Sequence, residues 1–171
     1  MQQESSIDHE RVRPAHDRHE ELAARVSELA RRHGVTVAVA ESLTGGNVAV
    51  ALAAAEAAGE WFRGSLVAYS SEVKHEVLAV PEGPVVSAEA ADAMARGVRK
   101  LLGADVAVGV TGAGGPDPQD GQEPGTVFVA VDDGEQQRLQ RLELAGDPQE
   151  VLVAAAAATL SMLVERLEAR S

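Results

Sequence analysis

Along the first third of the chain, apolar residues alternate between helical spacing and short continuous runs. Apolar positions three or four apart before Gly34 predict a helix over about residues 20–33. The next run, residues 36–40, is too short for a helix and indicates a buried strand. A glycine-containing turn and an alanine-rich helix to Gly59 come next, so this part predicts a strand, a tight turn and a helix.

The rest of the pattern predicts four more strands and three more helices. The strands fall at about 65–69, 105–111, 126–131 and 137–144, and the helices at about 71–78, 87–102 and 148–167. In the last strand, Leu139 is out of phase with Leu142 and Leu144, which indicates a bulge or a solvated edge. Helices that alternate with buried strands, with one late hairpin, predict a single-domain α/β fold: a three-layer α/β/α sandwich with a mixed, mainly parallel sheet.

Composition narrows the class of protein. Of the 171 residues, residues 1–18 are polar without apolar spacing and predict a disordered tail before one domain at 19–171. A net charge of −12 and an aromatic content of 2% argue against a nucleic-acid partner, because phosphates need cations and bases need aromatic platforms. There is no run of 18 apolar residues and no signal peptide, so we expect a cytoplasmic protein without a membrane partner.

The chain also lacks the residues of several common sites. It has no cysteine, which excludes thiol nucleophiles, disulfides and cysteine–zinc sites. Among the histidines, only His75 lies where a Ser-His-Asp triad is plausible, and His16 and His19 belong to a polar terminus rather than a metal site. We therefore expect no metal and no cofactor, and a hydroxyl nucleophile whose base is not histidine.

The best candidate for such a nucleophile is Ser42, in the segment Ala-Glu-Ser-Leu-Thr-Gly-Gly at 40–46. This segment follows a buried strand and opens a helix, where α/β sheets collect ligands and present free N–H groups. Ser42 would attack the substrate, and the amides of residues 44–46 would stabilise an oxyanion. The alternative is that Ser42 or Thr44 caps the helix and the two glycines ease a tight turn.

A second segment, Tyr-Ser-Ser-Glu-Val-Lys at 69–74, supplies a candidate base. The chain uses 13 arginines but only two lysines, Lys74 and Lys100. A desolvated lysine can lose its proton and act as a base, whereas arginine cannot. Tyr69 ends a predicted strand and could direct its hydroxyl to the same cleft. The alternative is a solvated helix face with Ser71 as its cap.

A third segment, Val-Thr-Gly-Ala-Gly-Gly-Pro-Asp at 110–117, again follows a buried strand. It fits neither a P-loop nor a dinucleotide fingerprint, but its backbone N–H groups could form a nest for a phosphate or a carboxylate. The alternative is a plain loop, since residues 112–125 hold five glycines and three prolines.

In this order, the three segments resemble the CinA carboxy-terminal domain family, which includes stand-alone nicotinamide-nucleotide amidohydrolases. The resemblance covers about residues 20–167. It implies an α/β/α fold and hydrolysis of the amide of nicotinamide mononucleotide to nicotinic acid mononucleotide and ammonia. By position in the motifs, it implies that Ser42 is the nucleophile and Lys74 its base, with Tyr69 and Thr111 completing the polar site.

The same resemblance implies that glycine-rich turns hold the nucleotide, which would be a small-molecule substrate, and that catalysis by serine needs no metal. The residues expected to bind the substrate are Thr44, Gly45, Gly46, Gly112, Gly114 and Gly115. We also expect a homo-oligomer, either a dimer or a trimer.

Two departures from the family pattern bear on the substrate. Ser71 stands where the tyrosine segment usually continues with asparagine, and Pro148 stands where Gly-Asp is usually followed by arginine. No arginine follows before Arg166, so a charge-assisted contact to phosphate worth about 1.5–3 kcal/mol would be lost. The alternative to an active amidohydrolase is a weakened relative that binds a nucleotide or a protein partner in a competence- or damage-related role.

Overall fold

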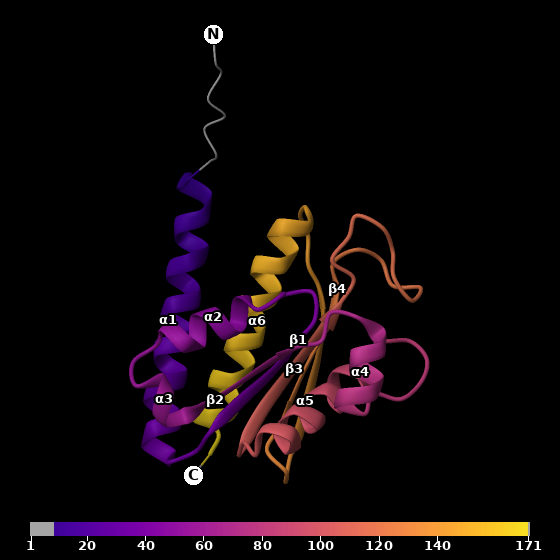
Figure 1. Cartoon of the computed structure of the whole chain (residues 1–171). Helices are drawn as coiled ribbons and strands as arrows, with labels where there is room; N and C mark the ends of the chain where they lie inside the picture. The colour runs from indigo at the N-terminus through magenta and orange to yellow at the C-terminus, as the bar shows by residue number, and fades with distance from the viewer. Residues whose placement is uncertain (1–8, 171) are drawn as a thin grey trace.

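Five strands form one mixed sheet with helices on both of its faces, in a computed structural model that describes residues 9–170 (Figure 1). The elements in chain order are α1 (His9–His33), β1 (Val37–Glu41), α2 (Asn47–Ala54), α3 (Ala58–Trp61), β2 (Phe62–Val67), α4 (Ser71–Leu78), α5 (Ala88–Leu102), β3 (Val106–Gly112), β4 (Thr126–Asp132), β5 (Gln137–Glu143) and α6 (Pro148–Glu168). The α/β/α prediction is confirmed. None of the helices within these residues is long and apolar enough to cross a membrane.

The strand order is β2-β1-β3-β4-β5. β1 pairs in parallel with both β2 and β3, whereas β4 runs antiparallel to β3 and to β5. The sheet is mixed, as predicted, and its parallel pairs are confined to the β2-β1-β3 half. Because these three strands run in the same direction, their carboxyl ends meet at one edge of the sheet, where ligand sites of α/β proteins form.

The sheet has one face of valines and one face of smaller side chains. The valines of β1, β3 and β4 belong to the core shared with α1, α2 and α6: Val37, Val39, Val106, Val108, Val110, Val127, Val129 and Val131. The positions between them in β1 and β3 include Ala38, Ala40, Ala107 and Gly109, on which α5 packs. The buried runs therefore alternate in size rather than in polarity, and the small face lets α5 lie close to the strand backbone.

Helix α1 is longer than the sequence predicted. It begins at His9, so residues 9–18 of the expected tail are helical, and residues 1–8 lie outside the described residues. Two ion pairs one turn apart support this polar stretch: His16 with Glu20 at 3.1 Å and Arg18 with Glu21 at 3.7 Å. The side chains from Leu22 to Ala30 that face inward belong to the valine-side core, which fixes the rest of the helix.

One local prediction was wrong, and one had been left open between two alternatives. The alanine-rich helix does not continue to Gly59; α2 ends at Ala54, and Ala57 takes a left-handed conformation with φ 53° before α3. This break lets Trp61 enter the core, where it is 2% exposed and its Nε1 donates to the Glu56 carbonyl at 3.1 Å. The last strand carries no bulge, since its register with β4 is continuous, and the solvated-edge alternative is correct.

The close packing of α5 predicts that Gly109→Ala destabilises the fold by about 1–3 kcal/mol, the usual cost of overpacking a core. A Cβ on Gly109 would lie 2.6 Å from the Ala91 carbonyl oxygen and 2.7 Å from the Ala95 nitrogen, so α5 would have to move. The matched control is Gly59→Ala, where a Cβ meets nothing within 4 Å. Urea denaturation followed by circular dichroism measures both variants, and equal midpoints for Gly109→Ala and the parent would contradict the prediction.

Candidate active site

The three sequence segments meet at the carboxyl edge of the parallel strands. Glu41, the last residue of β1, pairs with Val67 of β2 on one side and with Val110 of β3 on the other. The Ala68 amide donates to the Glu41 carbonyl at 2.7 Å, so the chain stays beside β1 as it leaves β2. By this register, Ser42 lies next to Thr111, and the segment that leads to Lys74 starts on its other side.

Ser42 lies in a tight turn rather than at a helix cap. The Gly45 amide donates to the Ser42 carbonyl at 3.0 Å, and Gly45 and Gly46 have φ values of 57° and 108°, which favour glycine. The cap residue of α2 is Gly46, which has no side chain to accept a hydrogen bond, so the capping alternative for Ser42 and Thr44 is wrong. Ser42 is 7% exposed, which leaves its hydroxyl at the edge of the buried interior.

A buried carboxylate that sequence reasoning missed lies directly before Ser42. Glu41 is 0% exposed, and its Oε1 accepts from the Thr44 hydroxyl at 2.7 Å and from the Val48 amide at 3.0 Å. Its Oε2 accepts from the Ala49 amide at 3.0 Å and from the Ser65 hydroxyl at 3.2 Å. A carboxylate has about four lone-pair sites, so these donors satisfy it and take up the first free amides of α2.

The amides that remain open near Ser42 come from two loops. Within residues 9–170, the amides of Thr44 and Gly46 find no acceptor, and neither do those of Gly114 and Gly115. The two loops approach each other, since a Cβ on Gly114 would lie 3.9 Å from the Leu43 Cβ. Unpaired N–H groups at such an edge can bind an oxyanion or an anionic group.

Gly112, also predicted to bind substrate, has a packing role. A Cβ on Gly112 would lie 2.8 Å from the Val127 Cγ2 and 2.9 Å from the Thr126 carbonyl oxygen. The strands β3 and β4 therefore leave no room for a side chain there. The Thr44 hydroxyl is likewise engaged by Glu41, so what Thr44 offers a ligand is its amide.

Lys74 is enclosed by the protein. Its side chain is 1% exposed, and Nζ donates to the Tyr69 carbonyl at 3.2 Å. Burial removes water from the ammonium and lowers the pKa of Lys74, while the negative charge of Asp120 opposes part of this change. The helix that carries Lys74 is capped by Ser70, whose Oγ accepts from the Val73 amide at 3.2 Å, rather than by the predicted Ser71.

The other two predicted site residues have different surroundings. Thr111 is 1% exposed, and its hydroxyl donates to the Val85 carbonyl at 2.7 Å. Asp120 accepts from the Val85 and Val86 amides at 2.8 and 3.0 Å and so ties the loop after β3 to the segment before α5. Tyr69 is 73% exposed, so its ring faces solvent while its carbonyl faces Lys74. Ser42, Lys74 and Thr111 are thus each buried, whereas the Tyr69 ring is exposed.

Arg166, the first arginine after Asp147, lies at the other end of the molecule. It pairs with Asp133, which directly follows the end of β4, and Arg170 pairs with the same carboxylate at 3.2 Å. Because β4 runs antiparallel to β3, this end of β4 is opposite to Ser42. Arg166 therefore cannot take the place of the arginine that Pro148 replaces.

The comparisons with known proteins agree with the geometry. The family described as the CinA C-terminal domain matches residues 19–167. The chain belongs to this family. It is 41% identical over 143 residues to a CinA-like protein of Citrifermentans bemidjiense, with 80% of this chain and 34% of that protein covered. A CinA-like protein of Myxococcus xanthus is 41% identical over 155 residues, with 86% and 37% covered. The chain therefore spans about a third of the length of these curated relatives.

Solved structures of CinA proteins share the fold over nearly their whole length. The competence damage-inducible protein A from Klebsiella pneumoniae matches with a TM-score of 0.85 and 33% identity, covering 90% of this chain and 99% of that one. A CinA superfamily protein from Enterobacter cloacae matches with a TM-score of 0.83 and 31% identity, covering 87% and 92%. The mixed sheet and its helices are thus those of CinA structures.

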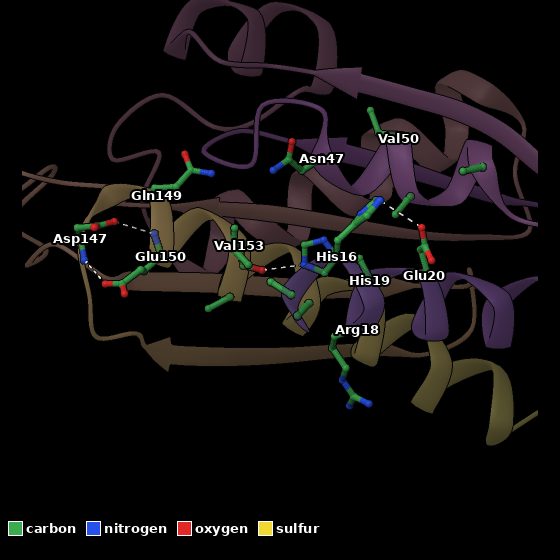
Figure 2. A pocket seen from close by; sticks show the side chains of 15 residues that line it. His16, Arg18, His19, Glu20, Asn47, Val50, Asp147, Gln149, Glu150 and Val153 are labelled. Carbon is green, nitrogen blue, oxygen red and sulfur yellow. Dashed lines mark hydrogen bonds and ion pairs between the residues drawn. The ribbon is translucent and has the colours of Figure 1, made fainter. Parts of the chain in front are cut away.

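The largest cavity described is not lined by Ser42. It has a volume of about 1090 Å³ and lies between α1, α2 and α6 (Figure 2). Val50, 66% exposed, lines it, and His19 is fixed in its wall by a hydrogen bond of 3.0 Å between Nε2 and the Val153 carbonyl. Asn47, which directly follows Gly46, is the lining residue nearest in sequence to the turn at residues 42–46. The cavity includes none of the three buried site residues.

Within residues 9–170, no group of three histidine, aspartate or glutamate side chains could hold a metal ion.

The burial of Lys74 predicts that Lys74→Met makes the protein more stable at pH 7, by about 1–4 kcal/mol, as is common when a buried charged group gives way to an apolar one. The pKa of Lys74 is lowered in the folded state, so between the folded and unfolded pKa values the unfolded chain binds more protons. The free energy of unfolding of the parent therefore increases as pH rises through that window. The difference in this free energy between Lys74→Met and the parent should become smaller. Lys100→Met, at a position outside the site, is the control. Denaturant midpoints between pH 7 and about 10.4, the ordinary lysine pKa, test this, and a constant difference would contradict it.

Proposed function

We propose that this CinA protein hydrolyses the carboxamide of nicotinamide mononucleotide to nicotinic acid mononucleotide and ammonia. The observation that carries the proposal is Lys74, a buried lysine that donates to the Tyr69 carbonyl just beyond the end of β2 and whose pKa is lowered by that burial. A lysine in its neutral form can take a proton from a hydroxyl, and this chain has no cysteine for the task. Membership of a family that includes nicotinamide-nucleotide amidohydrolases supplies the substrate.

In the proposed reaction, the Ser42 Oγ attacks the carboxamide carbon while the Lys74 Nζ accepts the hydroxyl proton. The oxyanion is stabilised by amides of the turn after Ser42, of which those of Thr44 and Gly46 are open. The C–N bond then breaks, Lys74 returns the proton to the leaving nitrogen, and ammonia departs. A water molecule, deprotonated in turn by Lys74, hydrolyses the ester on Ser42 and releases the carboxylate product.

The second candidate function is a weakened relative that binds a nucleotide or a protein partner without turnover. Pro148 in place of the usual arginine favours it, because no cationic side chain replaces that arginine at the start of α6. This alternative predicts nucleotide binding with no ammonia release, so the same assay separates the two candidates.

Ser42→Ala should abolish ammonia release from nicotinamide mononucleotide and leave the fold intact. Loss of a nucleophile costs several orders of magnitude in kcat, so we expect less than about 1% of the parent kcat. Purified parent and variant are compared by ammonia release and by circular dichroism. A variant that keeps more activity than this would remove Ser42 from the nucleophile role.

The matched test of the base compares Lys74→Arg with Lys74→Ala. Arginine keeps the positive charge but cannot accept a proton at neutral pH, so both variants should be equally inactive. Near-normal activity of Lys74→Arg would show that the position supplies charge rather than a base.

Substrate binding should depend on backbone amides rather than on one cation. Gly114 has an ordinary backbone conformation, and a Cβ there meets only the Leu43 Cβ at 3.9 Å, so a larger side chain folds but obstructs the amides. Gly114→Val should raise KM for the mononucleotide more than it lowers kcat, because the contact exists in ground and transition states alike. Nicotinamide riboside, which lacks the phosphate, should be a much poorer substrate for the parent. Equal kcat/KM for riboside and mononucleotide would contradict a productive phosphate site.

A further inference from the structure

The Glu41 carboxylate has no part in the reaction proposed above, yet its burial calls for a physical reason. A carboxylate without water is costly unless hydrogen bonds replace its hydration. Here four donors do so, and they come from three places: the turn after Ser42, the first turn of α2, and β2. One side chain therefore joins the end of β1 to the turn after Ser42, to α2 and to β2.

The donors are arranged so that Glu41 fixes the turn at both of its ends. The Thr44 hydroxyl binds Oε1 from within the turn, and the Val48 and Ala49 amides bind the two oxygens from the helix that follows it. Ser42 directly follows Glu41, which is the last residue of a strand that is buried at every position. The turn between these fixed points has two glycines in left-handed conformations and would otherwise be free to move.

We propose that Glu41 is the positioning residue of the nucleophile turn, residues 42–46. Its carboxylate, held by Thr44, Val48, Ala49 and Ser65, fixes the positions of the Ser42 hydroxyl and of the open amides in this turn. This inference rests on the proposed function for its effect on catalysis, but its geometric part does not. With all its acceptor sites filled, Glu41 is unsuited to take the Ser42 proton itself. Its contribution is to the geometry of attack, where displacement by about 1 Å can cost 10²-fold in rate.

The test compares Glu41→Gln with the parent. A glutamine fits the same space, but its NH₂ group cannot accept from a backbone amide and a hydroxyl, so one side of the anchor is lost. Glu82→Gln is the control, because it makes the same chemical change at an exposed loop position. Amide hydrogen exchange, measured by NMR without substrate, should quicken by about tenfold or more at the hydrogen-bonded amides of Gly45, Asn47, Val48 and Ala49 and stay unchanged in α5.

The kinetic arm uses nicotinamide mononucleotide. For Glu41→Gln, kcat should fall by about 100-fold while KM changes by less than about threefold, since a misplaced nucleophile affects the transition state more than binding. Parent-like exchange at these four amides, or a kcat within threefold of the parent in a folded variant, would overturn the proposal. A loss of stability with unchanged kcat would assign Glu41 a purely structural role.

A second variant keeps the test decisive should Glu41→Gln fail to fold. Ser65→Ala removes one donor from β2 and leaves the carboxylate with three. It should speed exchange at Ala49 and lower kcat by a smaller factor in the same direction, and no change in either would overturn the proposal. If the parent releases no ammonia, the proposed function fails by itself, and the exchange measurements still decide whether Glu41 holds the turn.

Discussion

The close approach of α5 to the small-residue face of the sheet is the constraint on which the site depends. At Gly109 the helix lies almost on the strand backbone, and any side chain there would separate the two. The opposite side of α5 repeats the arrangement, because Gly97 leaves no room for a Cβ beside the Leu78 carbonyl at the end of α4. The small side chains on this face of the sheet thus let α5 pack closely on it, and Gly97 lets α4 pack closely on α5. Helix α4 in turn holds Lys74 in the interior.

This packing gives the two buried charged groups of the site opposite properties. Lys74 is left with one carbonyl as its partner, so the loss of water dominates and its pKa falls. Glu41 is buried as deeply, but its carboxylate accepts hydrogen bonds from four donors, which fill its lone-pair sites. In the roles proposed above, Lys74 moves a proton and Glu41 holds the turn after Ser42 in place. The difference lies in the number of hydrogen-bond partners and not in the depth of burial.

Much of this could be read from the sequence, and what could not has a physical cause. Caps and glycines placed α5 and α6 nearly to the residue, and the scarcity of lysine directed attention to Lys74. The continuous apolar runs concealed the alternation of valine with alanine and glycine, because both classes count as apolar. Glu41 escapes sequence reasoning because its partners come from residues three, seven, eight and 24 positions away, which only the fold brings together. The outward ring of Tyr69 depends on where α4 begins, one residue beyond the cap at Ser70.

The hydrogen bonds already made around the site limit the places where an anionic group of a substrate can bind. The first amides of α2 are taken by Glu41, the start of α6 is capped by Asp147, and Arg166 is engaged by Asp133 at the opposite end of the sheet. What stays open is the backbone of the turn after Ser42 and of the loop at Gly114 and Gly115. That loop is held in place by Asp120, whose charge also acts on Lys74. In the proposed function, this one segment therefore both offers its amides to the substrate and influences the proton affinity of Lys74.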